Sequence, residues 1–146
     1  MQNIYSGIMS SFGHDKDGYD DDVISFFIHC YHVRDWIIHL NNLDVTARQV
    51  DLYINNHRAL KICSDLANGS KHCKLTRTMR GTSQPYIAEK KQDTSTWFTY
   101  SGGGEVMKCE YIIQSDGESF DALKLAAECV FLWESYVIKL AVIKTY

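Results

Sequence analysis

Hydrophobic residues recur at three- and four-residue steps in three long segments of the chain, which predicts three helices. The first segment covers about 20–41, and its apolar positions form one broad face, typical of a helix packed in a bundle: Val23, Phe26, Phe27, Cys30, Val33, Ile37 and Leu40. The second begins at Thr46, which forms a capping-box pattern with Gln49, and continues to Lys74. Its predicted buried side carries Leu52, Tyr53, Leu60, Cys63, Leu66 and Ala67.

The connection between the first two segments is short, so they are predicted to form an antiparallel hairpin. The third segment, about 119–144, is apolar around much of its girth. A helix with so little polar surface is predicted to be the central element or the one that forms a dimer.

One region follows a β rather than a helical pattern. β-branched and aromatic residues at 97–100 and 105–113 flank three glycines, which predicts a β-hairpin over about 96–114 around a flexible connection. These glycines are not a phosphate loop, because no Lys-Ser or Lys-Thr pair follows them. Residues 75–95 are polar and are expected to be a solvated connection. The predicted fold class is therefore mainly α: an antiparallel bundle of three to four helices with an inserted β-hairpin.

Length, charge and cysteine content narrow the class of protein. A chain of 146 residues predicts a single domain, assigned to 19–146, behind a flexible arm at 1–18. The formal net charge of −3 argues against a generic basic nucleic-acid binder. The sequence shows neither a membrane-length apolar run nor a signal-peptide pattern, so we expect a cytoplasmic protein with no membrane partner. Five scattered cysteines without a C-x-x-C pair predict buried free thiols.

The stretch from Asp65 to His72 is the most polar part of the second predicted helix. Asp65, Asn68 and His72 stand at i, i+3 and i+7, so a carboxylate, a carboxamide and an imidazole share one stripe. Gly69 lies among them, although a glycine inside a helix costs about 1 kcal/mol relative to alanine. Two explanations stay open: the glycine is a C-cap, or it lets another group approach the helix closely.

Arg34, Asp35 and His39 in the first predicted helix resemble the signature of the HEPN superfamily, in which an arginine followed by a polar residue is separated from a histidine by four to six residues. Asn68 and His72 are similar to the second half of that signature, although Ala67 occupies the arginine position. The resemblance implies a small helical dimer. It also implies a metal-independent endoribonuclease, or an inactive relative, in a bacterial or phage defence or toxin system, with no cofactor and no metal.

The residue types suit that chemistry. Histidine titrates near neutral pH and can move the ribose proton, while arginine offers a planar fork that matches phosphate. The predicted catalytic residues are Arg34, Asp35, His39, Asn68 and His72, and the predicted substrate-binding residues are Lys71, Lys74 and Arg77. Arg34 and His39 are about 140° apart around one helix, so the second helix or a second copy of the chain must complete the site.

Structural explanations compete with this one. Asp35 could accept a hydrogen bond from a neighbouring helix, and His39 could simply end its helix near the carboxyl dipole. His29 and His32 do not predict a metal site, because Cys30 points to another face and no carboxylate completes a ligand set. Two further functions stay open: a non-enzymatic interaction module with a protein partner, and a small-molecule sensor. The candidate partners are therefore RNA, another protein and a second copy of the chain.

Overall fold

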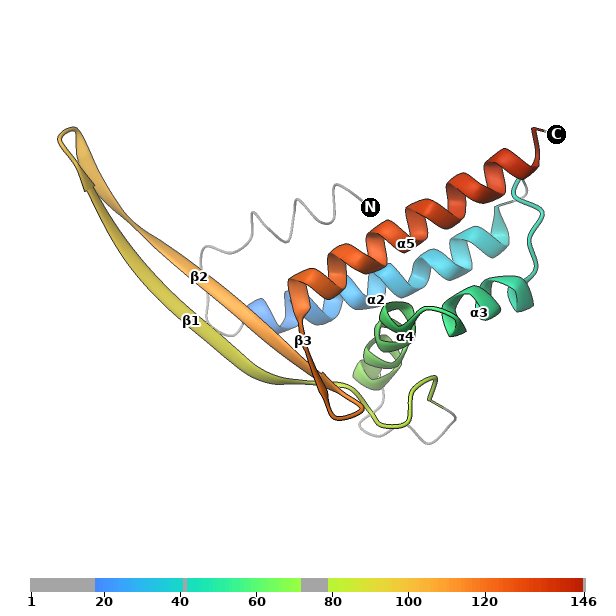
Figure 1. The fold of residues 1–146 in the computed structure, drawn as a ribbon, viewed down its shortest axis with the longest axis horizontal. Coiled ribbons are helices and arrows are strands. Elements are labelled where there is room, and N and C mark those ends of the chain that lie inside the picture. Colours follow the sequence, from blue (N-terminus) through green and yellow to red (C-terminus); the bar gives the residue numbers. More distant parts are fainter. Residues whose placement is uncertain (1–17, 41, 72–78, 146) are drawn as a thin grey trace.

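The computed structural model describes residues 18–40, 42–71 and 79–145, and Figure 1 shows their arrangement. The predicted arm at 1–18 lies almost wholly outside these residues. In chain order the elements are α2 (Gly18–His39), α3 (Ala47–Asn55), α4 (Arg58–Lys71), β1 (Tyr86–Thr99), β2 (Gly102–Ser115), β3 (Glu118–Asp121) and α5 (Ala122–Ile143).

The prediction of a mainly α bundle with an inserted hairpin is wrong. The described residues form four helices and a three-stranded antiparallel sheet in the order β1-β2-β3, so the fold is a mixed one. β1 begins ten residues before the predicted hairpin, in the segment expected to be a solvated connection. Both faces of this part of the ribbon meet solvent, so its sequence lacks the alternation of apolar and polar residues by which a half-buried strand is found.

The helical predictions are partly confirmed. The first helix spans nearly the predicted range, and the capping box is present: Thr46 Oγ1 accepts from Gln49 N at 3.3 Å, and Gln49 Oε1 accepts from Thr46 N at 2.8 Å. The second predicted helix, however, is two helices. α3 ends at Asn55, and Asn56 caps it by donating its N–H to the carbonyls of the last turn. Leu52, predicted to be buried, is exposed.

The hydrophobic core lies where α2, α4 and α5 pack together, beside the base of the sheet. Its largest fully buried side chains are Trp133, Phe27, Ile37, Ile54, Leu60 and Ile113. α5 is not a central element, because only one of its faces joins this core. Phe131, Ile138 and Val142 are exposed on the opposite face, and Leu123 and Ile143 are exposed near the two ends of the helix. No helix among the described residues is long and apolar enough to cross a membrane.

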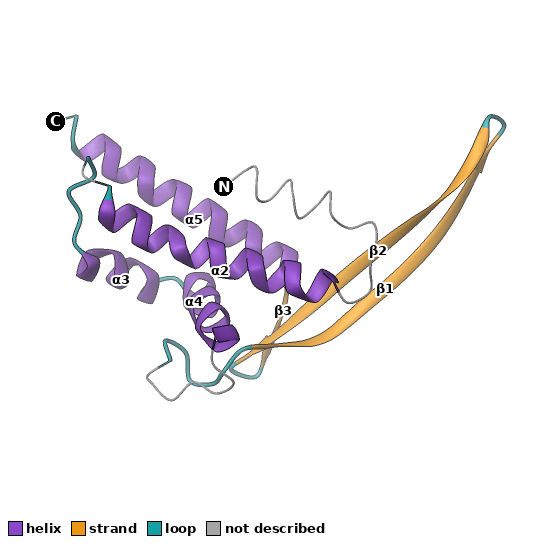
Figure 2. Cartoon of the chain, turned by 180° about the vertical axis from the view of Figure 1, so that it is seen from behind, coloured by secondary structure: helices purple, strands orange, loops and turns teal. Residues whose placement is uncertain are grey.

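β1 and β2 form a ribbon that projects away from the helices, and β3 pairs only with its base, at 112–115 of β2 (Figures 1 and 2). Near the tip, Trp97 pairs with Gly104 and Phe98 with Gly103. A Cβ on Gly103 would lie 2.8 Å from Phe98 Cδ1, and one on Gly104 would lie 3.0 Å from Trp97 Cζ2. The two glycines therefore leave room for the rings of Phe98 and Trp97 to lie against the paired strand. They belong to β2 and are not the flexible connection expected from the sequence.

Candidate functional site

Arg34 is held by two carboxylates. Its Nε and one terminal nitrogen bind both oxygens of Asp51 on α3 at 2.7 and 2.8 Å, and the other terminal nitrogen binds Asp35 at 2.8 Å. The Arg34 side chain is 22 % exposed and that of Asp35 is 54 % exposed. All three guanidinium nitrogens are thus occupied, and the two-point pair with Asp51 ties α2 to α3.

Arg80 completes the network from the loop that precedes β1. Its guanidinium donates to Asp51 Oδ1 at 2.7 Å, to Asn55 Oδ1 at 2.6 Å and to Ser64 Oγ at 3.0 Å. Asp51 therefore accepts from two arginines, one on α2 and one in the loop. We call Arg34, Asp51 and Arg80 the Asp51 network.

The Asp51 network is ionised at neutral pH. The hydrogen bond from Arg34 lowers the pKa of Asp51, and Arg80 lowers it further, while partial burial opposes both. The bond with Asp51 likewise raises the pKa of Arg34. Burial acts to lower the pKa of Arg80, but hydrogen bonds with Tyr31 and Asp51 outweigh it and raise that pKa. The positive charges of this cluster are therefore already balanced by carboxylates.

Two further carboxylates fix the loop that carries Arg80. Asp65, which is buried, accepts from the backbone N–H of Arg80 at 2.9 Å and of Gly81 at 2.8 Å. Directly after these residues, Asp116 accepts from the hydroxyls and backbone amides of Thr82 and Ser83, and these bonds lower its pKa to about 2. The loop is thus anchored at four consecutive residues, from Arg80 to Ser83.

Gly69 has a packing role. Gln84 Nε2 bonds to the Asp65 carbonyl at 3.1 Å, and a Cβ on Gly69 would lie 2.0 Å from that nitrogen. α4 continues to Lys71, so Gly69 is inside the helix and is not its C-cap. Of the two explanations open from the sequence, close approach of another group is the one that the structure shows.

A polar cavity of about 500 Å³ opens beside Arg80, between α2, α4 and the loop. It is lined by Tyr31, Asn55, Ser64, Asp65, Asn68, Met79 and Arg80. Such a lining offers hydrogen-bond donors and acceptors for a small polar ligand, but its cation is already paired with Asp51.

The structure brings together only some of the residues predicted for the site. Arg34 and Asp35 lie at the Asp51 network, whereas Asn68 has no part in that network and lines the polar cavity beside Arg80. His39 is the exposed last residue of α2, as the structural explanation expected. Lys71 is the last residue of α4, and the other predicted residues, His72, Lys74 and Arg77, lie outside the described residues.

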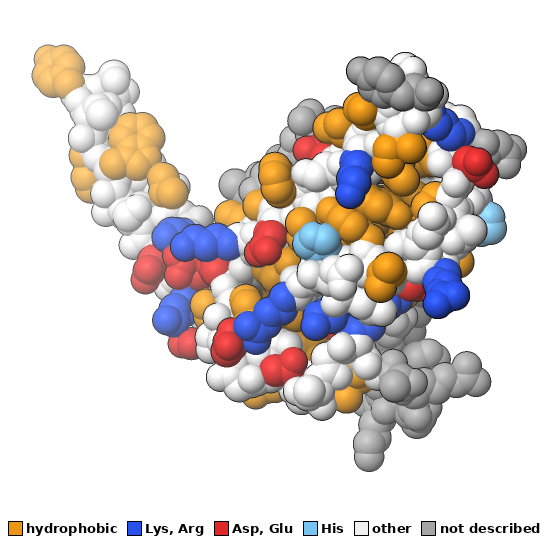
Figure 3. All heavy atoms as spheres, turned by 45° about the vertical axis from the view of Figure 1, so that its right-hand side comes forward, with side chains coloured by type: hydrophobic (Ala, Val, Ile, Leu, Met, Phe, Trp, Pro, Cys, Tyr) orange, Lys and Arg blue, Asp and Glu red, His pale blue; other side chains and the backbone are white. Residues whose placement is uncertain are grey.

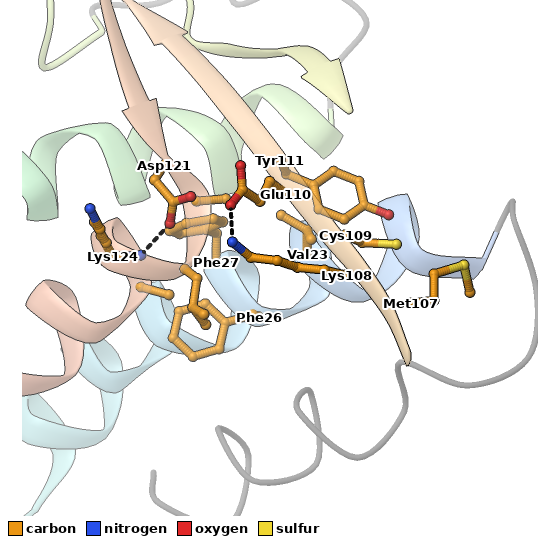
Figure 4. Close-up of a pocket in the computed structure, with 13 residues that line it drawn as sticks. Val23, Phe26, Phe27, Met107, Lys108, Cys109, Glu110, Tyr111, Asp121 and Lys124 are labelled. Carbon is orange, nitrogen blue, oxygen red and sulfur yellow. Dashed lines mark hydrogen bonds and ion pairs between the residues drawn. The ribbon is translucent and has the colours of Figure 1, made fainter. Parts of the chain in front are cut away.

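A second candidate site is a groove of about 450 Å³ at the base of the arm, between α2, β2 and α5 (Figure 4). Its apolar wall consists of Val23, Phe26, Phe27, Met107, Cys109, Tyr111, Ala122, Leu123 and Ala126. Lys108 pairs with Glu110 at 2.6 Å at the groove, and Asp121 caps α5 by accepting from Lys124 N at 2.9 Å. Lys108 and Glu110 neutralise each other and most of the lining residues are apolar, so the groove presents mainly apolar surface.

The tip of the arm is also apolar. Trp97 is 49 % exposed, Phe98 85 %, and Tyr100 fully, with Val106 and Met107 exposed beside them. Neither lysine nor arginine occurs between 92 and 107. Figure 3 shows hydrophobic side chains along the outer arm, beyond a band of charged groups near its base. The sequence predicted the hairpin but gave no sign that its rings point into solvent.

Known proteins give no guide to the function of this chain. No family model, curated protein or solved structure matches the chain. The described residues define a mixed helix-and-sheet protein with a projecting two-stranded arm, and its activity has to be inferred from the two sites.

Proposed function

We propose that the chain is a non-enzymatic assembly module in which two copies exchange their arms, the tip of each entering the groove of the other. One observation supports this most strongly: a projecting arm with exposed aromatic rings and an apolar groove occur on the same chain. A two-stranded ribbon is at best marginally stable in water by itself, so a long arm of this kind gains stability from a partner.

The chemistry of the tip favours a protein partner. Nucleic acids and anionic membranes are bound largely through lysine and arginine, and residues 92–107 contain neither. Aromatic side chains are instead typical of protein interfaces, where each buries roughly 150–250 Å². The partner surface must therefore be an apolar depression.

A second copy of the chain meets that requirement. The tip cannot reach its own groove, because Phe98 pairs with Gly103 and the groove begins further down the same ribbon at Met107, about 14 Å away along the strand. If two copies related by a twofold axis each inserted the tip of the arm into the groove of the other, both grooves would be filled. No free tip or groove would then remain to bind a third copy. An exchange of this kind also agrees with the dimer expected from the sequence.

The contacts of Arg34 favour a non-enzymatic role. A ribonuclease of the kind expected from the sequence needs this guanidinium on the phosphate, and here both of its neighbours are carboxylates. Binding a phosphate would require the two-point bond to Asp51 to break.

Sedimentation equilibrium tests the proposal. We expect the full chain to sediment at twice its 16.8 kDa mass at concentrations near about 10 µM, and to dissociate on dilution. A chain that remains monomeric up to about 1 mM would overturn the proposal.

The redox state of the cysteines indicates in which cellular compartment the protein works. Cys30, Cys63 and Cys129 are free and buried, as predicted, whereas Cys109 is free but only half-buried, and Cys73 lies outside the described residues. Free thiols support a reducing compartment, and we include the cytoplasm in the proposal on this ground.

A metal-independent endoribonuclease of HEPN-like type, in a defence or toxin system, is the second candidate. It is supported by the polar cavity, which both Asn68 and Arg80 line, because Asp51 accepts hydrogen bonds from both Arg80 and Arg34. RNA would be the substrate, with Lys71, Lys74 and Arg77 as phosphate ligands. Incubation of single-stranded and structured RNA with the chain in a chelator tests it. Cleavage that His39→Ala and His72→Ala abolish in folded protein would support it, and uncut RNA would overturn it.

A further inference from the structure

Three cysteines from three different helices meet in the core. Cys30 comes from α2, Cys63 from α4 and Cys129 from α5, and their Sγ atoms all lie within 4.8 Å of one another. The side chains are almost fully buried, with 4 %, 1 % and 0 % exposure. The group is independent of the arm, the groove and the Asp51 network.

Polar groups around the sulfurs are arranged unequally. Cys63 Sγ donates to the Phe27 carbonyl and Cys129 Sγ to the Ala59 carbonyl, each at 3.4 Å. Trp133 Nε1, also buried, has no hydrogen-bond partner.

We propose that Cys30, Cys63 and Cys129 form a three-coordinate, all-sulfur site for a soft monovalent metal ion, of which Cu(I) is the biological example. Thiolate ligands select Cu(I), zinc and iron–sulfur clusters over harder ions. Structural zinc takes four ligands, and among the described residues no histidine or carboxylate joins the three sulfurs. The number and softness of the ligands therefore favour Cu(I).

The geometry agrees with this assignment. Metal–sulfur bonds of about 2.3 Å in a trigonal arrangement place the sulfurs about 4 Å apart, so the cluster needs to contract by less than about 1 Å. Binding would link α2, α4 and α5 and so stabilise the helical part of the fold.

The experiment uses the full chain with Cys73→Ser and Cys109→Ser, so that only the three clustered thiols remain. Because their sulfurs are buried, the protein is refolded anaerobically with Cu(I) supplied by a chromophoric chelator. We expect one Cu(I) per chain, a higher Tm, and an X-ray absorption spectrum with three sulfurs per copper. Absence of copper, or a shell of two sulfurs or of nitrogen and oxygen, would overturn the proposal whether or not the chain dimerises.

Serine variants identify the ligands, because serine is close to cysteine in size. Cys30→Ser, Cys63→Ser and Cys129→Ser should each weaken Cu(I) binding more than about tenfold, with circular dichroism reporting whether the metal-free variant folds. Equal binding by folded Cys30→Ser would contradict the site. Tighter binding of Zn(II) than of Cu(I) by the same three sulfurs would contradict the monovalent assignment.

Discussion

Replacement of Trp97, Phe98 and Tyr100 by serine should turn the dimer into a monomer and leave the helical part of the fold intact. Burying a large apolar side chain contributes about 1.5–3 kcal/mol, so loss of three rings should raise the Kd of the dimer roughly a thousandfold or more. Most of this ring surface is exposed on the single chain, so the cost to the helical core should be small. Sedimentation equilibrium measures the Kd, and far-ultraviolet circular dichroism measures the fold.

The exposed face of α5 provides the matched control. Phe131 and Ile138 are 66 % and 63 % exposed, comparable with the arm residues, but they lie on another surface. Their replacement by serine should leave the dimer unchanged. If this variant dissociates and the arm variant does not, the dimer forms through α5 and the role assigned to the arm is wrong.

Replacement of Asp51 by alanine should lower the free energy of unfolding at neutral pH by about 2–3 kcal/mol. The variant loses the bonds to Arg34 and Arg80 together, and it leaves two half-buried guanidinium groups without that carboxylate. Three segments lose a shared anchor: α2, α3 and the loop before β1. Urea unfolding followed by circular dichroism gives the value.

Asp35→Ala is the control for charge alone. Asp35 also binds Arg34, but it is 54 % exposed, and exposed ion pairs contribute about 0–1 kcal/mol. Equal losses from the two variants would contradict the anchoring role of Asp51.

The effect of Asp51 should also depend on pH. Folding lowers its pKa from the ordinary value of 3.8, so its stabilisation is complete above that value and is lost as pH falls through the lower folded pKa. The difference between the parent and Asp51→Ala should therefore shrink below about pH 4.

The sequence predicted elements whose signals are local. The helix from Gly18 and the cap at Thr46 follow from residues a few positions apart, and the structure contains both. The first half of β1 could not be found in this way, because a ribbon in solvent selects no alternating pattern. The break at Asn56 was missed since apolar residues continue on both sides of it.

The sites depend on contacts that are distant in sequence. Arg34 stood out through its spacing to His39, yet it bonds to Asp51, seventeen positions away on another helix. Arg80 lies in the polar segment 75–95 that was expected to be a solvated connection, and only the tertiary fold pairs it with Asp51. The meeting of Cys30, Cys63 and Cys129 likewise requires three helices to be placed, so no spacing rule predicts it.

The most direct test of arm exchange is a crosslink between the tip of one copy and the groove of another. Phe98→Cys is combined with Cys73→Ser and treated with a short bis-maleimide, which can join the new thiol to Cys109 in the groove. Cys30, Cys63 and Cys129 are buried, so we expect their thiols not to react with the bis-maleimide. We predict a covalent dimer that disappears when Cys109 is replaced by serine. A chain that stays single, or a dimer that persists without Cys109, would contradict arm exchange.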